Sequence, residues 1–342
     1  MSGAATLTRP IAPPAPRVAP LAGPTRVGAL RVALVLSMWA GALAAVGVSR
    51  SLTSSFGGTV RTLGSANPYV DEAATLLGWL LAVAGLVFAT TAARRVGGSA
   101  PARAAVAVSV GGAALLAAGA ACALWAVAIA SSPTHSKGWL SNATKVLATT
   151  REVVTLSKVS AILAAAGLVA LAAACGIGAQ RASVSPSGAA RMRVLLALGG
   201  AFVLMAVGQA TTLAYLWSGS MPGQAGVLVA YASTTLGWLL VALAIALLPG
   251  ALRGPRTSAL IVGVPIGVIG ALSLGAWSGT VLTYAWLRVT GVGAGSYATL
   301  SKIGSATQWA GWLALALAVG VVATRVTAIK LSLPRVPTAP RR

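Results

Sequence analysis

The segment TLSKVSAILAAAGLVALAAACGIGAQR, at residues 155–181, returns without a gap as TLSKIGSATQWAGWLALALAVGVVATR at residues 299–325. Each copy opens with Thr-Leu-Ser-Lys, continues through an apolar stretch that holds no charged residue, and closes with an arginine. An α-helix needs about 20 apolar residues to cross the hydrocarbon core of a bilayer. Both copies therefore predict a membrane-spanning helix with a lysine at one end and an arginine at the other.

Stretches of this kind fill most of the chain. The expected spans cover about residues 32–49, 74–93, 104–130, 159–180, 194–217, 228–249, 258–286 and 307–324. Apolar residues make up 57% of the sequence and charged residues 8%, against about 25% charged residues in soluble domains. Because a soluble fold could not bury this much apolar surface, we expect an all-α integral membrane protein, a bundle of eight transmembrane helices. A signal peptide is the alternative for the first span.

The four even-numbered spans share a glycine that precedes the arginine at the helix end. The pairs are Gly78 with Arg94, Gly167 with Arg181, Gly237 with Arg253, and Gly311 with Arg325. The pentapeptide Leu-Gly-Trp-Leu-Leu also occurs twice, at 77–81 and 236–240. The pattern predicts two four-helix halves, residues 31–181 and 191–325, which are parallel because each holds an even number of helices. A disordered cytoplasmic tail, residues 1–30, and a basic cytoplasmic tail, residues 326–342, are expected to flank them.

Basic residues accumulate on one side of the predicted spans. The connections at 94–103, 181–193 and 250–257 are short and rich in arginine, and they contain no acid. The opposite loops, about 50–73, 132–158, 218–227 and 287–306, hold all three acids. The positive-inside rule then predicts cytoplasmic termini, and the Ala-, Leu- and Arg-rich composition is typical of a bacterial inner-membrane protein. The formal charge of +22 reflects this orientation rather than nucleic-acid binding, because the basic residues lie at the ends of apolar spans.

Few residues are available for chemistry. Away from their ends the eight spans hold no charged side chain, which argues against an ion-coupled pump. His135 is the only histidine and Asp71 the only aspartate, so the chain lacks a haem ligand pair and a pair of catalytic aspartates. We expect no cofactor, no metal and no catalytic residue. A weaker hypothesis is an enzyme that acts on lipid-linked substrates through His135, Asp71 or Glu152.

Aromatic residues accumulate on the side opposite to the arginines. Amphipathic rings at one level form an interfacial belt in many membrane proteins. The alternative is an aromatic-lined cavity or docking face that opens outward. The candidate binding residues on this side, together with the two lysines of the repeated Thr-Leu-Ser-Lys, are Trp79, Trp125, Lys158, Tyr215, Trp217, Trp238, Tyr284, Trp286, Lys302 and Trp312.

Four polar residues near the membrane also have two interpretations each. Lys158 and Lys302 either snorkel to the headgroups or anchor an anionic headgroup, one in each half. Gln209 and Gln308 are expected inside the membrane, where they can hydrogen-bond between helices or take part in a site.

The leading hypothesis is a non-enzymatic membrane subunit, an accessory or scaffold protein whose aromatic outer face binds a partner. The partner would be another membrane protein subunit or an amphipathic molecule such as a lipid or a pigment. The alternative is an uncoupled transporter or channel with a pathway between the two halves. That pathway predicts a continuous polar stripe formed by Gln209, Thr211, Thr212, Thr280 and Thr283.

Overall fold

A computed structural model describes residues 24–48, 68–94, 100–130, 143–183, 188–218, 224–251, 258–290 and 295–331. Within these ranges the chain forms eight α-helices and no strand. The helices are α1 (Pro24–Gly47), α4 (Pro68–Arg94), α5 (Ala100–Ala130), α6 (Ala143–Ser183), α7 (Ala189–Ser218), α8 (Gln224–Ala251), α9 (Ser258–Thr290) and α10 (Gly295–Leu331). All eight are long and apolar enough to cross a membrane, which confirms the number and type of elements expected from the sequence.

Several helices extend beyond the apolar stretches that predicted them. α6 has 41 residues and begins at Ala143, so part of the expected loop 132–158 is helical. No glycine or proline interrupts residues 143–166, and the helix continues past the apolar boundary because nothing in its sequence stops it. α10 begins at Gly295 and runs to Leu331, which places Lys302 in a helix and extends the helix into the expected tail. α1 likewise begins at Pro24, inside the segment 1–30.

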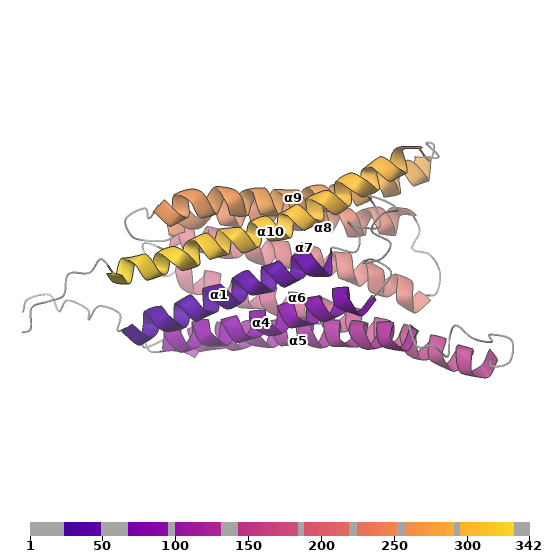
Figure 1. The fold of residues 1–342 in the computed structure, drawn as a ribbon, viewed down its shortest axis with the longest axis horizontal. Coiled ribbons are helices and arrows are strands. Elements are labelled where there is room, and N and C mark those ends of the chain that lie inside the picture. The colour runs from indigo at the N-terminus through magenta and orange to yellow at the C-terminus, as the bar shows by residue number, and fades with distance from the viewer. Residues whose placement is uncertain are drawn as a thin grey trace, which may run out of the picture.

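Each helix packs against the next helix along the chain, and α10 packs against α1 to close the cycle. Figure 1 shows the start of α1 and the end of α10 at the same end of the bundle. The closing contact uses small residues: a Cβ built on Gly41 would lie 3.2 Å from the Cβ of Ala316, and one on Gly320 would lie 2.9 Å from the sulfur of Met38. An even number of helices allows every neighbouring pair in this cycle to be antiparallel.

The four glycines of the repeated pattern all lie where an even-numbered helix crosses the helix before it. A Cβ on any of them would approach a backbone carbonyl oxygen of that helix too closely for an ordinary contact. The distances from the built Cβ to the carbonyl oxygen are 3.2 Å for Gly78 and Ala40, 2.7 Å for Gly167 and Gly112, 3.1 Å for Gly237 and Ala201, and 2.9 Å for Gly311 and Gly270. At Gly167 and Gly311 a Cβ would fit only if the two backbones moved apart, and at Gly78 and Gly237 the neighbouring backbone would have to give by a few tenths of an ångström.

Two of these crossings have glycine on both helices. A Cβ on Gly112 would lie 2.8 Å from the oxygen of Gly167, and one on Gly270 would lie 2.9 Å from the oxygen of Gly311. In both pairs a leucine four residues after the first glycine covers the second, since Leu116 contacts Gly167 and Leu274 contacts Gly311. The hairpins α5–α6 and α9–α10 are therefore packed in the same way.

The interior is filled mainly by alanine, with a few hydroxyl groups that are satisfied locally. Among the described residues no buried side-chain nitrogen or oxygen lacks a hydrogen-bond partner. Most hydroxyls donate to a carbonyl three or four residues earlier in their own helix, as Ser109 does to Ala105. Such back-bonding satisfies the hydroxyl without water, which suits a helix that passes through an apolar medium.

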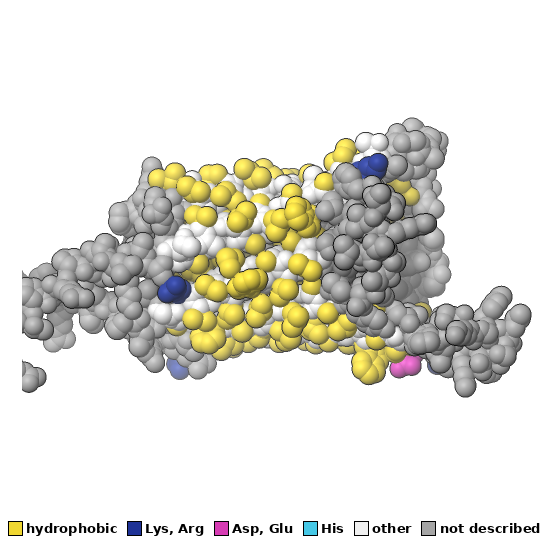
Figure 2. All heavy atoms as spheres, in the orientation of Figure 1, with side chains coloured by type: hydrophobic (Ala, Val, Ile, Leu, Met, Phe, Trp, Pro, Cys, Tyr) yellow, Lys and Arg dark blue, Asp and Glu magenta, His cyan; other side chains and the backbone are white. Residues whose placement is uncertain are grey.

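The lateral surface is apolar. Figure 2 shows hydrophobic side chains over the middle of the bundle and charged side chains near its two ends. Large side chains such as Ile269, at 59% exposure, and Leu317, at 62%, lie on this surface away from the ends of their helices. Soluble monomers rarely expose a contiguous apolar surface of such extent.

Candidate functional site

The predicted aromatic residues divide into two groups in the structure. Trp79, Trp238 and Trp312, which follow repeated glycines, are half-buried. Trp79 packs against a cluster built on Leu116 and Leu168. The rings of Trp238 and Trp312 meet edge to face, with centroids 5.6 Å apart and planes at 89°. This contact bridges α8 and α10, which are not neighbours in the cycle, so these tryptophans have a packing role.

The second group is exposed on the lateral surface. Trp125 on α5 is 62% exposed, Trp286 on α9 is 56% exposed and Tyr284 is 37% exposed. Exposed indole rings of this kind are available to lipid headgroups, to a bound molecule or to another protein. The side chains of Tyr215 and Trp217 lie outside the described part of the structure.

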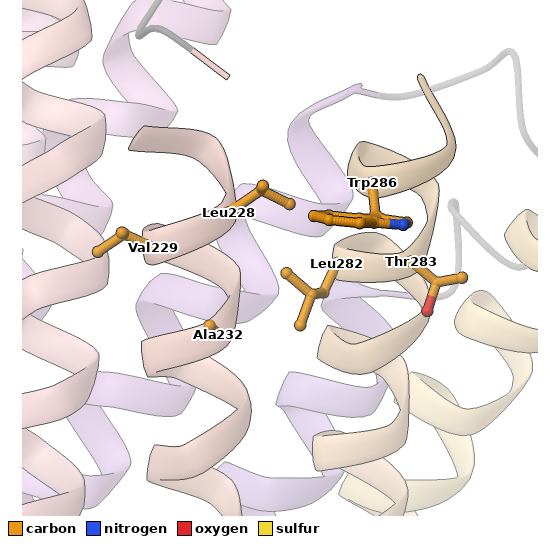
Figure 3. Close-up of a pocket in the computed structure, with 6 residues that line it drawn as sticks. All are labelled: Leu228, Val229, Ala232, Leu282, Thr283 and Trp286. Atoms are coloured by element: carbon orange, nitrogen blue, oxygen red, sulfur yellow. The ribbon is translucent and has the colours of Figure 1, made fainter. Parts of the chain in front are cut away.

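Trp286 lies at the edge of a groove between α8 and α9, which we call the α8–α9 groove. The groove has a volume of about 460 Å³ and is lined by Leu228, Val229, Ala232, Leu282, Thr283 and Trp286. Figure 3 shows the Trp286 ring extending from α9 toward Leu228 of α8, with Leu282 beside it on the same helix. The only hydroxyl in this lining, that of Thr283, donates to the carbonyl of Gly279 at 2.9 Å. The groove thus offers an apolar wall beside an amphipathic ring.

A second cavity, of about 380 Å³, lies where α4, α5, α6 and α7 converge; we call it the Glu72 cavity. Its polar lining comes from Glu72 of α4, Ser157 and Ser160 of α6, and Gln209 of α7. Its apolar lining comes from α5 and α6 and comprises Ala123, Ala126, Val127, Val153, Ala161 and Ala164. Three helices therefore bring a carboxylate, a carboxamide and two hydroxyls to one space, and α5 adds only apolar residues.

The sequence predicts Gln209 as a polar residue inside the membrane, and it places Glu72 with the acids of the expected loop at about 50–73. In the structure α4 begins at Pro68, so Glu72 is the fifth residue of this helix and lies just beyond its first turn. A signal in the sequence was the spacing of seven residues between Glu72 and Trp79, which places both on one helix face. Trp79 and Ala164 pack against the same cluster of buried residues, and Ala164 also lines the cavity.

The residues expected to form one polar stripe are distributed over three places. Gln209 lines the Glu72 cavity and Thr283 lines the α8–α9 groove. The hydroxyl of Thr280 lies 2.5 Å from a Cβ built on Gly304, so it packs against α10. Thr211 donates to the carbonyl of Gly208 in its own helix, and the side chain of Thr212 lies outside the described residues.

The remaining candidates lie along α6 and α10 or outside the described residues. Lys158 is half-buried near the start of the apolar part of α6, whereas Lys302 is exposed at the corresponding place of α10. Gln308 is half-buried in α10, next to the exposed Trp309. Glu152 is exposed on α6, and both His135 and the side chain of Asp71 lie outside the described residues.

Cys122 and Cys175 are free thiols. In the part of the chain that the structure describes, no three His, Cys, Asp or Glu side chains gather as metal ligands. Comparisons with protein-family models, with curated proteins and with solved structures give no match to this chain.

Proposed function

We propose that this chain is a multi-pass protein of a bacterial inner membrane, with cytoplasmic termini, and a non-enzymatic accessory subunit that binds a lipid-like molecule. The apolar lateral surface supports membrane insertion, because a bilayer removes that surface from water. The described basic residues support the orientation: those at the end where α1 begins are Arg31, Arg103, Arg181, Arg191 and Arg193, and those at the opposite end are Arg151, Lys158 and Lys302. The larger group is the cytoplasmic one under the positive-inside rule.

The proposal includes two parallel four-helix pseudo-repeats. The Gly112–Gly167 and Gly270–Gly311 crossings support it. Each half contains one of these crossings, and in each a leucine four residues after the first glycine covers the second. The crossings of Gly78 on Ala40 and of Gly237 on Ala201 form the second matching pair. The sequence register and the backbone contacts therefore point to the same division.

The α8–α9 groove carries the binding proposal. In a bilayer its apolar walls face hydrocarbon, so the natural occupant is the acyl or isoprenoid chain of an amphipathic molecule. Trp286 lies near the end of the span Leu260–Leu287, where an indole can contact a headgroup and a chain together. Gln209 lines the Glu72 cavity, Thr283 lines the α8–α9 groove and Thr280 packs against α10, and this arrangement favours binding at the groove over an uncoupled pathway between the halves.

Photo-crosslinking tests this proposal. A phospholipid with a photoreactive acyl chain, added to the full chain in nanodiscs, is expected to label peptides of α8 and α9 around the groove. Trp286→Ala is expected to lower this labelling severalfold, because the ring is a wall of the groove. Trp125→Ala is the matched control, since that indole is equally exposed but does not line the groove. Equal labelling in both variants, or labelling spread evenly over all helices, would contradict the proposal.

A further inference from the structure

The α8–α9 groove is only about one helical turn deep. Its lining covers residues 228–232 of α8 and 282–286 of α9, which is about 6 Å along each helix at 1.5 Å per residue. Both segments lie at the ends of the spans Gly226–Ala251 and Leu260–Leu287. The hydrocarbon core of a bilayer is about 30 Å thick. A lipid in this groove therefore contacts it only with the part of the molecule next to the headgroup, and any selectivity must come from that part.

The electrostatic character of the lining limits the headgroups that it can favour. Among the described residues the lining contains no charged side chain. The hydroxyl of Thr283 donates its proton to the carbonyl of Gly279, which leaves lone pairs but no proton for a ligand. An anionic headgroup would therefore find neither a cation nor a hydroxyl donor in this lining. The π-face of Trp286 is negative, and such a face attracts cations.

The indole ring of Trp286 lies across the groove. Figure 3 shows the ring edge-on, with its plane across the direction of α8 and α9 and with Leu282 on one side of it. One face is therefore turned toward Leu282, and the other, which we call the outer face, is turned toward the end of α9 at Thr290. Trp286 lies one residue before the end of the span Leu260–Leu287, so the outer face lies at the level of the lipid headgroups.

We propose that the α8–α9 groove prefers phospholipids whose headgroup ends in an ammonium group to anionic phospholipids. This inference rests on the lipid binding proposed above for the same groove. The chain next to the headgroup lies against Leu228, Val229 and Leu282, and the ammonium group lies over the outer face of Trp286. The attraction is a cation–π interaction, which needs no carboxylate.

The test uses the purified full chain in nanodiscs of a neutral galactolipid, which carries neither phosphate nor ammonium. Three phospholipid probes share one acyl chain, with the photoreactive group near its ester, and their headgroups end in ethanolamine, choline or glycerol. The first two probes are expected to label the α8 and α9 peptides around the groove about two- to fivefold more than the glycerol probe, the ratio that an exposed cation–π contact gives. Because choline has no N–H donor, equal labelling by choline and ethanolamine separates attraction to the ring from hydrogen bonding.

Variants of two tryptophans make the result specific. Trp286→Leu keeps an apolar side chain in the groove and removes the π-face, so it is expected to retain labelling by all three probes and to lose the preference. Trp286→Phe is expected to show an intermediate preference, because a phenyl ring attracts cations less than an indole does. Trp125→Leu is the matched control, since that indole is similarly exposed but does not line the groove, and it is expected to keep the wild-type preference.

Three outcomes would overturn the headgroup preference. They are groove labelling by the glycerol probe that equals or exceeds that by the ethanolamine probe, a choline probe that labels no better than the glycerol probe, and a preference that survives in Trp286→Leu. In each of them the groove is still labelled, so lipid binding there stands and only the preference fails. If no probe labelled the peptides around the groove, the lipid-binding proposal would fail, and the headgroup preference with it.

Discussion

At the scale of single residues, glycine is the most constrained position in this bundle. Four glycines lie under a carbonyl oxygen of the preceding helix, and two of those crossings have glycine on both sides. Other glycines have no such neighbour: a Cβ on Gly176 of α6 would meet nothing within 4 Å. One helix thus offers both a glycine that packing requires and a glycine that it does not.

Gly167→Ala is expected to destabilise the protein by about 1–3 kcal/mol, because its methyl group would lie 2.7 Å from the oxygen of Gly112 and the backbones must separate. Gly176→Ala is the matched control on the same helix. It is expected to leave stability unchanged or to raise it by up to about 1 kcal/mol through helix propensity. Thermal unfolding in detergent measures both, and a Gly167→Ala variant at least as stable as the wild type would show that the two backbones do not meet there.

At this scale the sequence reveals the glycines and Gln209, whereas it does not predict the cavity beside Glu72. The glycines occupy equivalent positions in the repeated segments, so the sequence alone indicates that they share a role. The environment of Glu72 depends on α5, α6 and α7, which approach α4 only after folding. The sequence also does not distinguish the exposed tryptophans from the half-buried ones. Every face of these helices is apolar, so only the packing of the helices decides which face is buried.

At the scale of helices, apolar stretches in the sequence locate each helix but not its ends. α6 continues beyond its apolar residues because residues 143–166 hold no glycine or proline, whereas α10 continues through Gly304 back to Gly295. Neighbouring helices approach closely at several glycines, and polar side chains also join α7 to α8 and α8 to α9. Arg191 of α7 donates to the carbonyl of Ala251 at 3.3 Å. The hydroxyl oxygen of Thr235 lies 2.8 Å from the carbonyl of Tyr231 and 3.0 Å from the hydroxyl of Ser278.

Ser278 is fully buried, and its hydroxyl also donates to the carbonyl of Tyr231 at 3.2 Å. Ser278→Ala is expected to lower stability by about 0.6 kcal/mol, the usual size of an interhelical hydrogen bond in a membrane. Thr307→Ala is the control, since that hydroxyl donates only within α10, to Ile303 or Gly304. Chemical unfolding in mixed micelles measures the free energy of unfolding of both variants. A decrease of several kcal/mol in Ser278→Ala would contradict the expectation that this hydrogen bond contributes only a small part of the stability.

At the scale of the whole molecule, the eight helices form a closed cycle of antiparallel neighbours. The sequence predicts the number of helices and their alternation, and it carries no direct sign that α10 returns to α1. That closure depends on small residues at Gly41, Ala316 and Gly320, which are unremarkable in a chain with 40 glycines. Closure brings the two ends of the helical chain together at the arginine-rich end (Figure 1).

The central claim is that this bundle spans a membrane with its arginine-rich end in the cytoplasm. Single cysteines in a background without Cys122 and Cys175 test it directly. Glu152 and Ser183 are both exposed, at opposite ends of α6. A membrane-impermeant maleimide added to intact spheroplasts is predicted to label Glu152→Cys, and to label Ser183→Cys only after lysis. Labelling of Ser183→Cys before lysis, whether alone or together with Glu152→Cys, would contradict the account.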